Sequence, residues 1–302
     1  TARIDLAWTD AATNETEYRV YRSTDNVTFS LIDTIAANST SYSDTTITSG
    51  TTYYYKVAAY NAGGEALSDA VVANTLTLGL VSYWQLEEAS GTRVDSWGNN
   101  DLTPPNNPAN AVGIVGNAVA LVGSSSQQLV VANNATLQSG NIDHTIAAWF
   151  YPSQVSASAC IITKNDVDAG FNVAGYEWML YQVSSTKVRF LVARGGGGSG
   201  SGSSSVTSDV DVTLNAWNYV EGFYDEANVR IGVVVNGTVK TAASATVPGT
   251  STGSVRIGAV GPGSSYLTGR VDEVGFWKRL HTTDERSSQY NGGSGRAPSF
   301  LA

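Results

Sequence analysis

Residues 216–240 read AWNYVEGFYDEANVRIGVVVNGTVK, and this stretch decides the fold. Two runs rich in aromatic and β-branched residues, 216–226 and 229–235, have the length and composition of strands. The pair Asn236-Gly237 follows the second run, and both of these residue types tolerate a positive φ. The stretch therefore predicts a two-residue hairpin turn between antiparallel strands.

Similar strand candidates lie on both sides of this hairpin, from residue 79 to residue 277. They read GLVSYWQL, NAVALVG, QQLVVAN, HTIAAWFYP, ACIITKND, YEWMLYQV, KVRFLVAR, SVRIGAVG and TGRVDEVGFW. Together with the hairpin they make about ten or more strands, which is too many for one small sandwich and is typical of a jelly roll. Residues 195–205, GGGGSGSGSSS, interrupt them with a composition that cannot build a core, so we expect a mobile loop there.

An earlier set of short alternating segments fills residues 1–76. It includes EYRVYRS, FSLIDTIA and TTYYYKVAAYN, separated by Asn, Asp, Ser and Gly. Alternation places Tyr18 and Val20 on one face of their strand, and Tyr53 and Tyr55 on one face of another. Short strands with this punctuation indicate a β-sandwich.

The segment 1–76 resembles a fibronectin type III domain. Trp8 matches the core Trp of an early strand, and Gly50-Thr51-Thr52-Tyr53 matches the approach to the tyrosine corner, where a Tyr hydroxyl bonds back to the backbone. Trp8 comes too early in the chain, so the first strand of the family is missing. The resemblance implies an immunoglobulin-like β-sandwich that serves as a spacer, and we expect it to be marginally stable because one strand edge is exposed.

Residues 79–302 resemble the laminin G-like jelly rolls of the concanavalin A-like superfamily. The matching pieces are YWQLEE from Tyr83, the loop DSWGNND at 95–101, the Trp-bearing strand at 145–149 and the closing strand GRVDEV from Gly269. The whole chain is thus expected to be all-β, with an immunoglobulin-like β-sandwich followed by a concanavalin A-like jelly-roll sandwich.

Composition excludes several classes of partner. The net charge of −9 argues against nucleic acid, because nucleic-acid binding depends on Lys and Arg neutralising phosphates. No apolar run approaches the ~20 residues of a membrane helix, so membrane insertion is not expected. The sequence begins without a Met and in the middle of a strand pattern. We therefore interpret the chain as part of a larger multidomain chain or of a virion.

Cysteine usage points to the same settings. Cys160 is the only cysteine, so no intrachain disulfide can form, and its apolar neighbours predict a buried thiol. Such a chain suits an extracellular protein, either secreted or on the surface of a bacterium, or the surface of a virion.

The 95–101 loop is the best candidate for a metal site. Short Asx side chains in a Gly-containing turn can direct several oxygens inward, and calcium takes six to eight oxygen ligands. The family resemblance adds the Asp of the closing strand, so the candidate calcium ligands are Asp95, Asn99, Asp101 and Asp272. The alternative is that these Asp and Asn residues only form Asx turns.

Three aromatic residues are candidates for ligand binding. Trp97 stands in the same polar loop, where we expect it to be partly exposed, and aromatic faces stack on sugar rings. Tyr176 and Trp178 are two positions apart on one strand, so they are expected to share a face and to line the concave sheet. Core packing would explain all three equally well.

Nothing in the sequence indicates catalysis. Glycosidases need two carboxyl groups across the cleft, whereas Glu221 is a lone strand carboxylate and Asp272-Glu273 point to opposite faces. His144 and His281 have no Ser or Cys nucleophile pattern beside them. We therefore expect a non-catalytic carbohydrate-recognition or adhesion protein, a lectin-like module supported by calcium. The alternative is a structural or decoration module of a bacterial surface protein or phage virion that binds no specific glycan.

Overall fold

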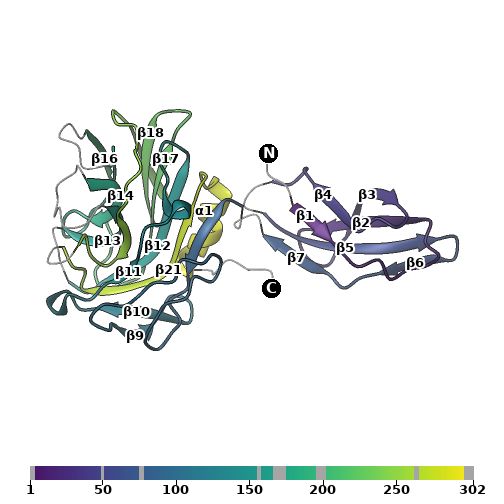
Figure 1. Cartoon of the computed structure of the whole chain (residues 1–302), viewed down its shortest axis with the longest axis horizontal. Helices are drawn as coiled ribbons and strands as arrows, with labels where there is room; N and C mark the ends of the chain where they lie inside the picture. Colours follow the sequence, from purple (N-terminus) through teal and green to yellow (C-terminus); the bar gives the residue numbers. More distant parts are fainter. Residues whose placement is uncertain are drawn as a thin grey trace. The chain divides into compact units, whose positions relative to one another are not determined.

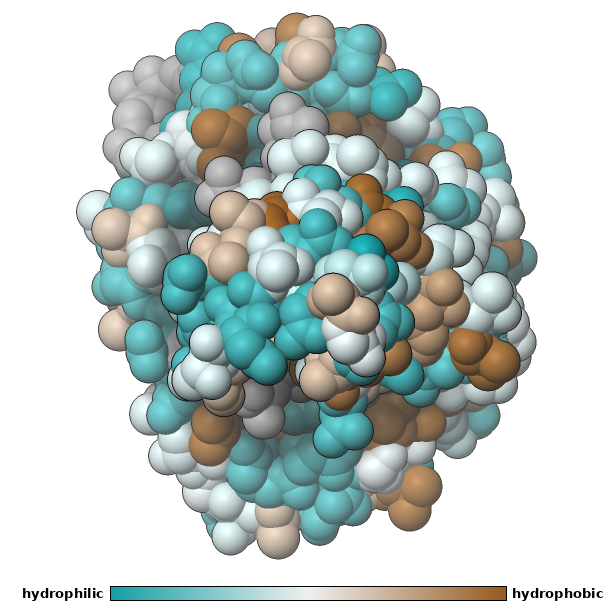
Figure 2. All heavy atoms as spheres, turned by 90° about the vertical axis from the view of Figure 1, so that its right-hand side faces the viewer, coloured by the Kyte–Doolittle hydropathy of each residue, from teal (hydrophilic) through white to brown (hydrophobic). Residues whose placement is uncertain are grey.

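A computed structural model describes residues 4–48, 51–74, 78–154, 158–165, 175–194, 202–261 and 265–295 (Figure 1). Nearly all of its regular structure is β-strand, so the predicted all-β class is confirmed. The chain forms two compact units. The first contains the described residues up to Leu78 together with Thr282–Ser288, and the second contains those of Gly79–His281 and the described residues from Gln289 on. On the face shown in Figure 2, hydrophobic residues stand singly or in small groups among hydrophilic ones.

The first unit contains two sheets. One is the antiparallel pair of β1 (Ile4–Ala7) and β4 (Ser41–Asp44). The other has five strands, with β7 (Val71–Asn74) beside β5 and the order β3 (Ser30–Ala36), β2 (Glu17–Ser23), β5 (Thr52–Asn61), β6 (Gly64–Leu67).

Alternation along these strands builds the core of the first unit. Val20 and Tyr55 are fully buried and pack with Ile4, Tyr53 and Ala73. The Tyr53 hydroxyl accepts a hydrogen bond of 2.9 Å from the backbone N–H of Thr48, as expected for a tyrosine corner. In the described part of the chain, β1 pairs only with β4. The fibronectin type III assignment itself remains an interpretation.

The second unit is a jelly roll of two larger sheets. The eight-stranded sheet has β8 beside β21 and runs in the order β19 (Thr238–Ala243), β18 (Arg230–Val235), β17 (Asn218–Asp225), β12 (His144–Pro152), β21 (Gly269–Trp277), β10 (Asn117–Leu121), β9 (Ala109–Val112), with β8 spanning Leu80–Trp84. The six-stranded sheet runs β11 (Leu129–Val131), β20 (Ser254–Ile257), β13 (Ala159–Asn165), β14 (Tyr176–Gln182), β15 (Val188–Ala193), β16 (Ser203–Thr207). A short helix, α1 (Thr283–Tyr290), follows the closing strand β21.

The main core fills the space between these two sheets. Aromatic side chains from both sheets meet there, and the rings of Trp178 and Phe276 have centroids 5.7 Å apart. Each fully buried large apolar side chain contributes roughly 1.5–3 kcal/mol relative to exposure. Trp149 points away from this core and stacks on Tyr290 of α1 at 6.1 Å, so the other face of the eight-stranded sheet is also covered.

Two local predictions are confirmed in this unit. Asn236 and Gly237 have φ angles of 49° and 83°, and Val235 pairs with Thr238 across the turn. Cys160 is fully buried in β13, and burial raises the pKa of its thiol. Residues 195–201 of the predicted mobile loop lie outside the described residues, whereas Ser203–Ser205 pair with β15 as part of β16, so the loop prediction is wrong for them. No helix among the described residues has the length and apolar character needed to cross a membrane.

Candidate functional site

Asp95 organises the loop that the sequence singled out. Its Oδ1 accepts hydrogen bonds from the backbone N–H groups of Tyr83 (2.9 Å), Trp97 (3.2 Å) and Gly98 (2.9 Å), and its Oδ2 accepts from the N–H of Asn100 (3.0 Å). A carboxylate can accept about four hydrogen bonds, so these four bonds occupy all of its acceptor positions. Asp95 therefore holds the loop against strand β8, and the Asx-turn alternative describes its contacts.

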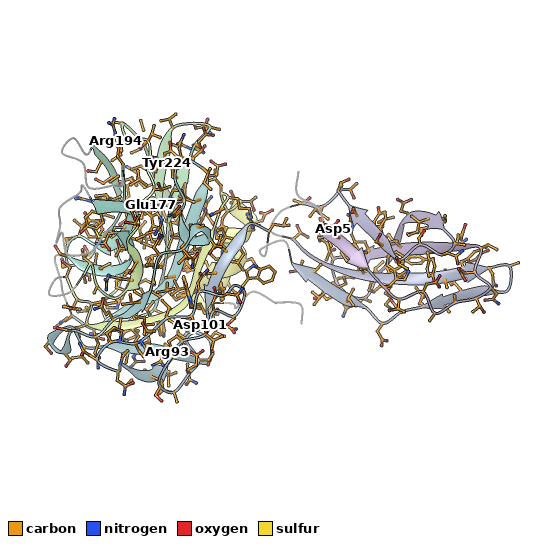
Figure 3. All side chains as sticks on the ribbon, viewed as in Figure 1. Asp5, Arg93, Asp101, Glu177, Arg194 and Tyr224 are labelled. Atoms are coloured by element: carbon orange, nitrogen blue, oxygen red, sulfur yellow. The ribbon has the colours of Figure 1, made fainter. Side chains whose placement is uncertain are left out.

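Two other predicted ligands lie in the same loop. Asp101 is exposed, and its Oδ1 accepts the backbone N–H of Asp95 at 2.9 Å (Figure 3). Asn99 is also exposed. The loop thus presents one amide and one carboxylate side chain to solvent beside a buried carboxylate.

Asp272 is fully buried in β21 and holds a different loop. Its Oδ2 accepts from the N–H groups of Ile114 (2.8 Å) and Val115 (3.2 Å), and its Oδ1 accepts from the N–H of Glu273 (2.9 Å). Its hydrogen bonds therefore go to the 114–115 turn rather than to the 95–101 loop. Among the described residues, no three His, Cys, Asp or Glu side chains form a group that could hold a metal. A calcium ion would have to take over oxygens that now accept N–H groups, and calcium binding stays a prediction.

Trp97 lies partly in solvent, as expected. Its side chain is 42% exposed, and its indole N–H donates to the carbonyl of Leu80 at 3.0 Å. This bond fixes the ring against the start of β8 and leaves part of the ring uncovered.

A pocket adjoins this loop. Its walls are the 98–100 part of the loop, the edge of β8 and the 3-10 turn η3 (Ala135–Leu137), and its lining residues are Val81, Gly98, Asn99, Asn100, Asn134, Ala135 and Thr136. The pocket therefore offers side-chain amides and a hydroxyl beside the apolar surface of residues such as Val81 and Ala135.

Hydrogen bonds between side chains join the two walls of the pocket. The Asn100 amide donates to Ser82 Oγ at 2.7 Å and accepts from the amide of Asn134. Asn134 in turn caps η3 by accepting from the N–H of Thr136 at 2.9 Å. Asn100 and Asn134 are thus held in place before any ligand arrives. Neither Asn100 nor Asn134 was among the predicted site residues, because their role depends on two loops that are 34 positions apart.

Tyr176 and Trp178 are placed differently from Trp97. Both are buried, at 1% and 0% exposure. Trp178 lies in the main core, whereas Tyr176 belongs to a separate cluster with Cys160, so the two rings do not meet on one face. The cause is a register shift in the pairing of β13 with β14, which leaves Glu177 between them as an extra residue. Their predicted role in ligand binding is untested.

The structure also joins residues that the sequence left apart. The Glu221 carboxylate lies 3.0 Å from His281 Nδ1 and accepts from the Tyr219 hydroxyl at 3.1 Å, and Gln289 Nε2 lies 3.3 Å from the same ring nitrogen. No local pattern could reveal this pair, because Glu221 and His281 are 60 positions apart. Both side chains are buried, so a substrate cannot reach them directly.

Asp272 and Glu273 are neighbouring buried carboxyl groups with raised pKa values. Burial raises the pKa of Asp272 to about 7 and that of Glu273 to about 8. The Glu273 carboxylate bonds the hydroxyl of Tyr83, and its backbone has a φ of 48° at the bulge where β12 and β21 change register. These carboxyls therefore act inside the fold, where they tie strands and turns together.

A comparison with protein families supports the fold. The family described as the concanavalin A-like lectin/glucanases superfamily matches residues 123–285, more than half of the chain. No curated protein matches the sequence.

Solved structures of clostridial toxin domains share this fold. The binding domain of Paraclostridial Mosquitocidal Protein 1 has a TM-score of 0.56 at 13% identity and covers 71% of this chain and 52% of its own. The botulinum neurotoxin serotype D binding domain has a TM-score of 0.53 at 13% identity, covering 71% and 52%. The binding domain of botulinum neurotoxin DC, solved in complex with SialylT, has a TM-score of 0.51 at 11% identity, covering 70% and 51%. The chain thus spans about half the length of the binding domains that it matches.

Proposed function

This chain belongs to the concanavalin A-like lectin/glucanases superfamily, and from that premise we propose that it is a non-catalytic carbohydrate-recognition protein. The proposed site is the pocket between the 98–100 loop and η3, with Trp97 at its side. An extracellular location, where glycans are displayed, is part of the proposal.

The observation that carries the proposal is the exposed Trp97 ring next to a preformed pocket that contains side-chain amides. Sugars present hydroxyl groups that both donate and accept hydrogen bonds, and side-chain amides such as Asn99 also do both. Sugar rings also have apolar faces that stack on an indole. Trp97 precedes the pocket residue Gly98, and its indole bonds Leu80 next to the pocket residue Val81, so stacking and hydrogen bonding are available to one ligand.

The similar toxin domains give general support. They are binding domains by their descriptions, and one was solved with SialylT. Because identity is only 11–13%, this likeness supports the fold of the jelly roll and does not locate a sugar site.

The same geometry favours binding over hydrolysis. Glycoside hydrolysis needs two carboxyl groups flanking the scissile bond, and no Asp or Glu lines the pocket. Glu221, Asp272 and Glu273 are all buried, and each is bonded inside the fold.

Calcium has a supporting role in the proposal. The exposed oxygens of Asn99 and Asp101 would take the ion at the rim of the loop, while Asp95 keeps the loop in shape. Asp272 of β21 stays the fourth proposed ligand, and its carboxylate now accepts the N–H groups of Ile114, Val115 and Glu273.

The test is a panel of glycans and polysaccharides, applied to the purified chain with calcium and again with a chelator. We expect binding that Trp97→Ala weakens about tenfold, because one stacked ring contributes on the order of 1 kcal/mol. Trp217→Ala is the matched control, since Trp217 is a partly buried aromatic that packs on Tyr151 away from the pocket. A wild-type chain that binds nothing on the panel in either buffer would instead favour the structural or decoration role.

A further inference from the structure

The first unit has an uncovered apolar groove along β5 and β6. Val57 and Ala59 of β5, with Ala66 of β6, form one side, and Trp8 at the end of β1 forms the other. In a sandwich, the inner face of one sheet is covered by strands of the other. Here a two-stranded sheet faces a five-stranded one, so part of the larger sheet is left open.

Two buried polar atoms in the groove lack hydrogen-bond partners among the described residues. They are the indole Nε1 of Trp8 and the carboxylate Oε2 of Glu15, whose Oε1 accepts the N–H of Asn38. Trp8 lines the apolar part of the groove, and Glu15 lines the adjoining polar part, whereas the carboxylate of Glu65 is bonded to Tyr21 and paired with Arg19. A buried group without a partner costs about 1–3 kcal/mol. The indole requires an acceptor and the carboxylate requires a donor, so one ligand should offer both.

The edge of β1 supplies a further binding element. β1 pairs with β4, and in the described ranges no strand pairs with its other side. Extended peptides bind such edges through main-chain hydrogen bonds, while alternate side chains enter a pocket. A peptide backbone carries both a carbonyl and an N–H at each residue, which are the two groups that Trp8 and Glu15 lack.

We propose that this groove binds an extended peptide segment as an added strand. Its alternate residues are apolar and face Val57, Ala59 and Ala66, and a Lys or Arg at one end faces Glu15. Charge complementarity sets this choice, because Oε2 of Glu15 is buried without a partner among the described residues and no Lys or Arg lines the groove. The inference concerns the first unit and does not depend on the proposed glycan site.

The probe is a fluorescein-labelled peptide in which Val and Thr alternate and one end carries two Lys, titrated into the full chain. We expect the fluorescence anisotropy of the peptide to rise with the protein concentration and to reach a plateau, which indicates saturable binding. Ala66→Arg places a large charged side chain in the groove and should abolish it, and Glu15→Gln should weaken it about tenfold through loss of a charge-assisted bond. Asp33→Asn is the matched control, because Asp33 is an exposed acid on β3 at the opposite edge of the sheet.

A second readout follows Trp8 itself. The indole N–H resonance of Trp8, identified with Trp8→Phe, should shift on titration with the peptide because the group gains an acceptor. Ala59→Arg provides a second blocking variant, on the other strand that lines the groove, and an unchanged melting curve confirms that each variant folds.

Three results of the binding experiments would overturn the proposal. They are the lack of saturable binding by the wild type, equal binding by the two blocking variants, and equal binding of a Ser/Gly peptide with the same Lys residues. Sedimentation that shows self-association lost in Ala66→Arg would also overturn it, since the occupant would then be a second copy of the chain.

Discussion

At the scale of single residues, one polar side chain often fixes a whole loop. Asp95 does so in the jelly roll by accepting four backbone N–H groups, and the Tyr53 hydroxyl does so in the first unit. In both cases these hydrogen bonds fix the conformation of a turn that apolar burial alone would not fix. Removal of either side chain is therefore expected to lower the free energy of unfolding.

Asp95→Ala should destabilise the jelly roll by about 2–4 kcal/mol, because four N–H groups lose a charged acceptor. Chemical denaturation measures the change, with Asp101→Ala as the control that removes one such bond. If chelation of calcium lowers the stability of the wild type as much as Asp95→Ala does, the loop depends on a metal rather than on these hydrogen bonds.

Tyr53→Phe should destabilise the first unit by about 1 kcal/mol, since the Thr48 N–H loses its acceptor. Tyr54→Phe tests the neighbouring position on the same strand, where the side chain is only partly buried, and it should have little effect. Equal effects of the two substitutions would mean that the corner bond does not contribute.

At the scale of elements, β21 carries two adjacent buried carboxyl groups. It supplies Asp272, Glu273 and the bulge that orients them, and it lies between β12 and β10 while also pairing with β8. A strand that bears carboxyls with raised pKa values makes the stability of its sheet depend on pH.

The jelly roll should become less stable as the pH rises from about 4.5 to about 8. The folded pKa of Glu273 is about 8 against an ordinary 4.5, so the folded state holds a proton that the unfolded state releases in this range. The stabilising contribution is complete below the unfolded pKa and is lost as the pH passes the folded one. For Glu273 the effect is on the order of 4 kcal/mol.

The melting temperature of wild type and Glu273→Gln across this pH range measures the effect. Gln cannot titrate, so the variant should show a flatter dependence, with Asp272 supplying the remaining slope up to its pKa of about 7. A wild-type melting temperature that rises between pH 5 and pH 8 would contradict the assignment.

The strands β13 and β14 carry a buried ion pair that anchors neighbouring loops. Lys164 and Glu177 are both fully buried with 3.9 Å between Nζ and Oε2, and Lys164 also donates to Asn133 and to the carbonyl of Gly253. Lys164→Met should destabilise the jelly roll by about 3–5 kcal/mol, because it leaves a buried carboxylate without its cation. Lys164→Met combined with Glu177→Gln should recover part of the loss in a denaturation series; no recovery would show that the pair itself does not matter.

The sequence predicted elements well where the signal is local. Asn236-Gly237 specified its turn, and the alternation of Tyr18 with Val20 specified a buried face. It could not predict contacts between distant segments, such as Glu221 with His281. The sequence also did not reveal the bulge that separates Tyr176 from Trp178. One extra residue reverses the face of every side chain beyond it, so the prediction that the two rings share a face was wrong.

At the scale of the whole molecule, the two units have separate cores. The first is built around Tyr55 and Val20, and the second around the layer that includes Trp178 and Phe276. Each unit should therefore unfold as its own cooperative transition. In calorimetry, Tyr53→Phe should shift only one transition and Lys164→Met only the other; a single transition that both variants shift equally would contradict this.

The central claim is that the jelly roll binds carbohydrate beside Trp97. The measurement that tests it most directly is a calorimetric titration of the chain with the strongest glycan from the panel, repeated with Trp97→Ala, Asn99→Ala and the control Trp217→Ala. We predict saturable binding by the wild type and the control, with affinity about tenfold lower in the two pocket variants. Binding that all three variants retain unchanged would place any carbohydrate site elsewhere and contradict the account.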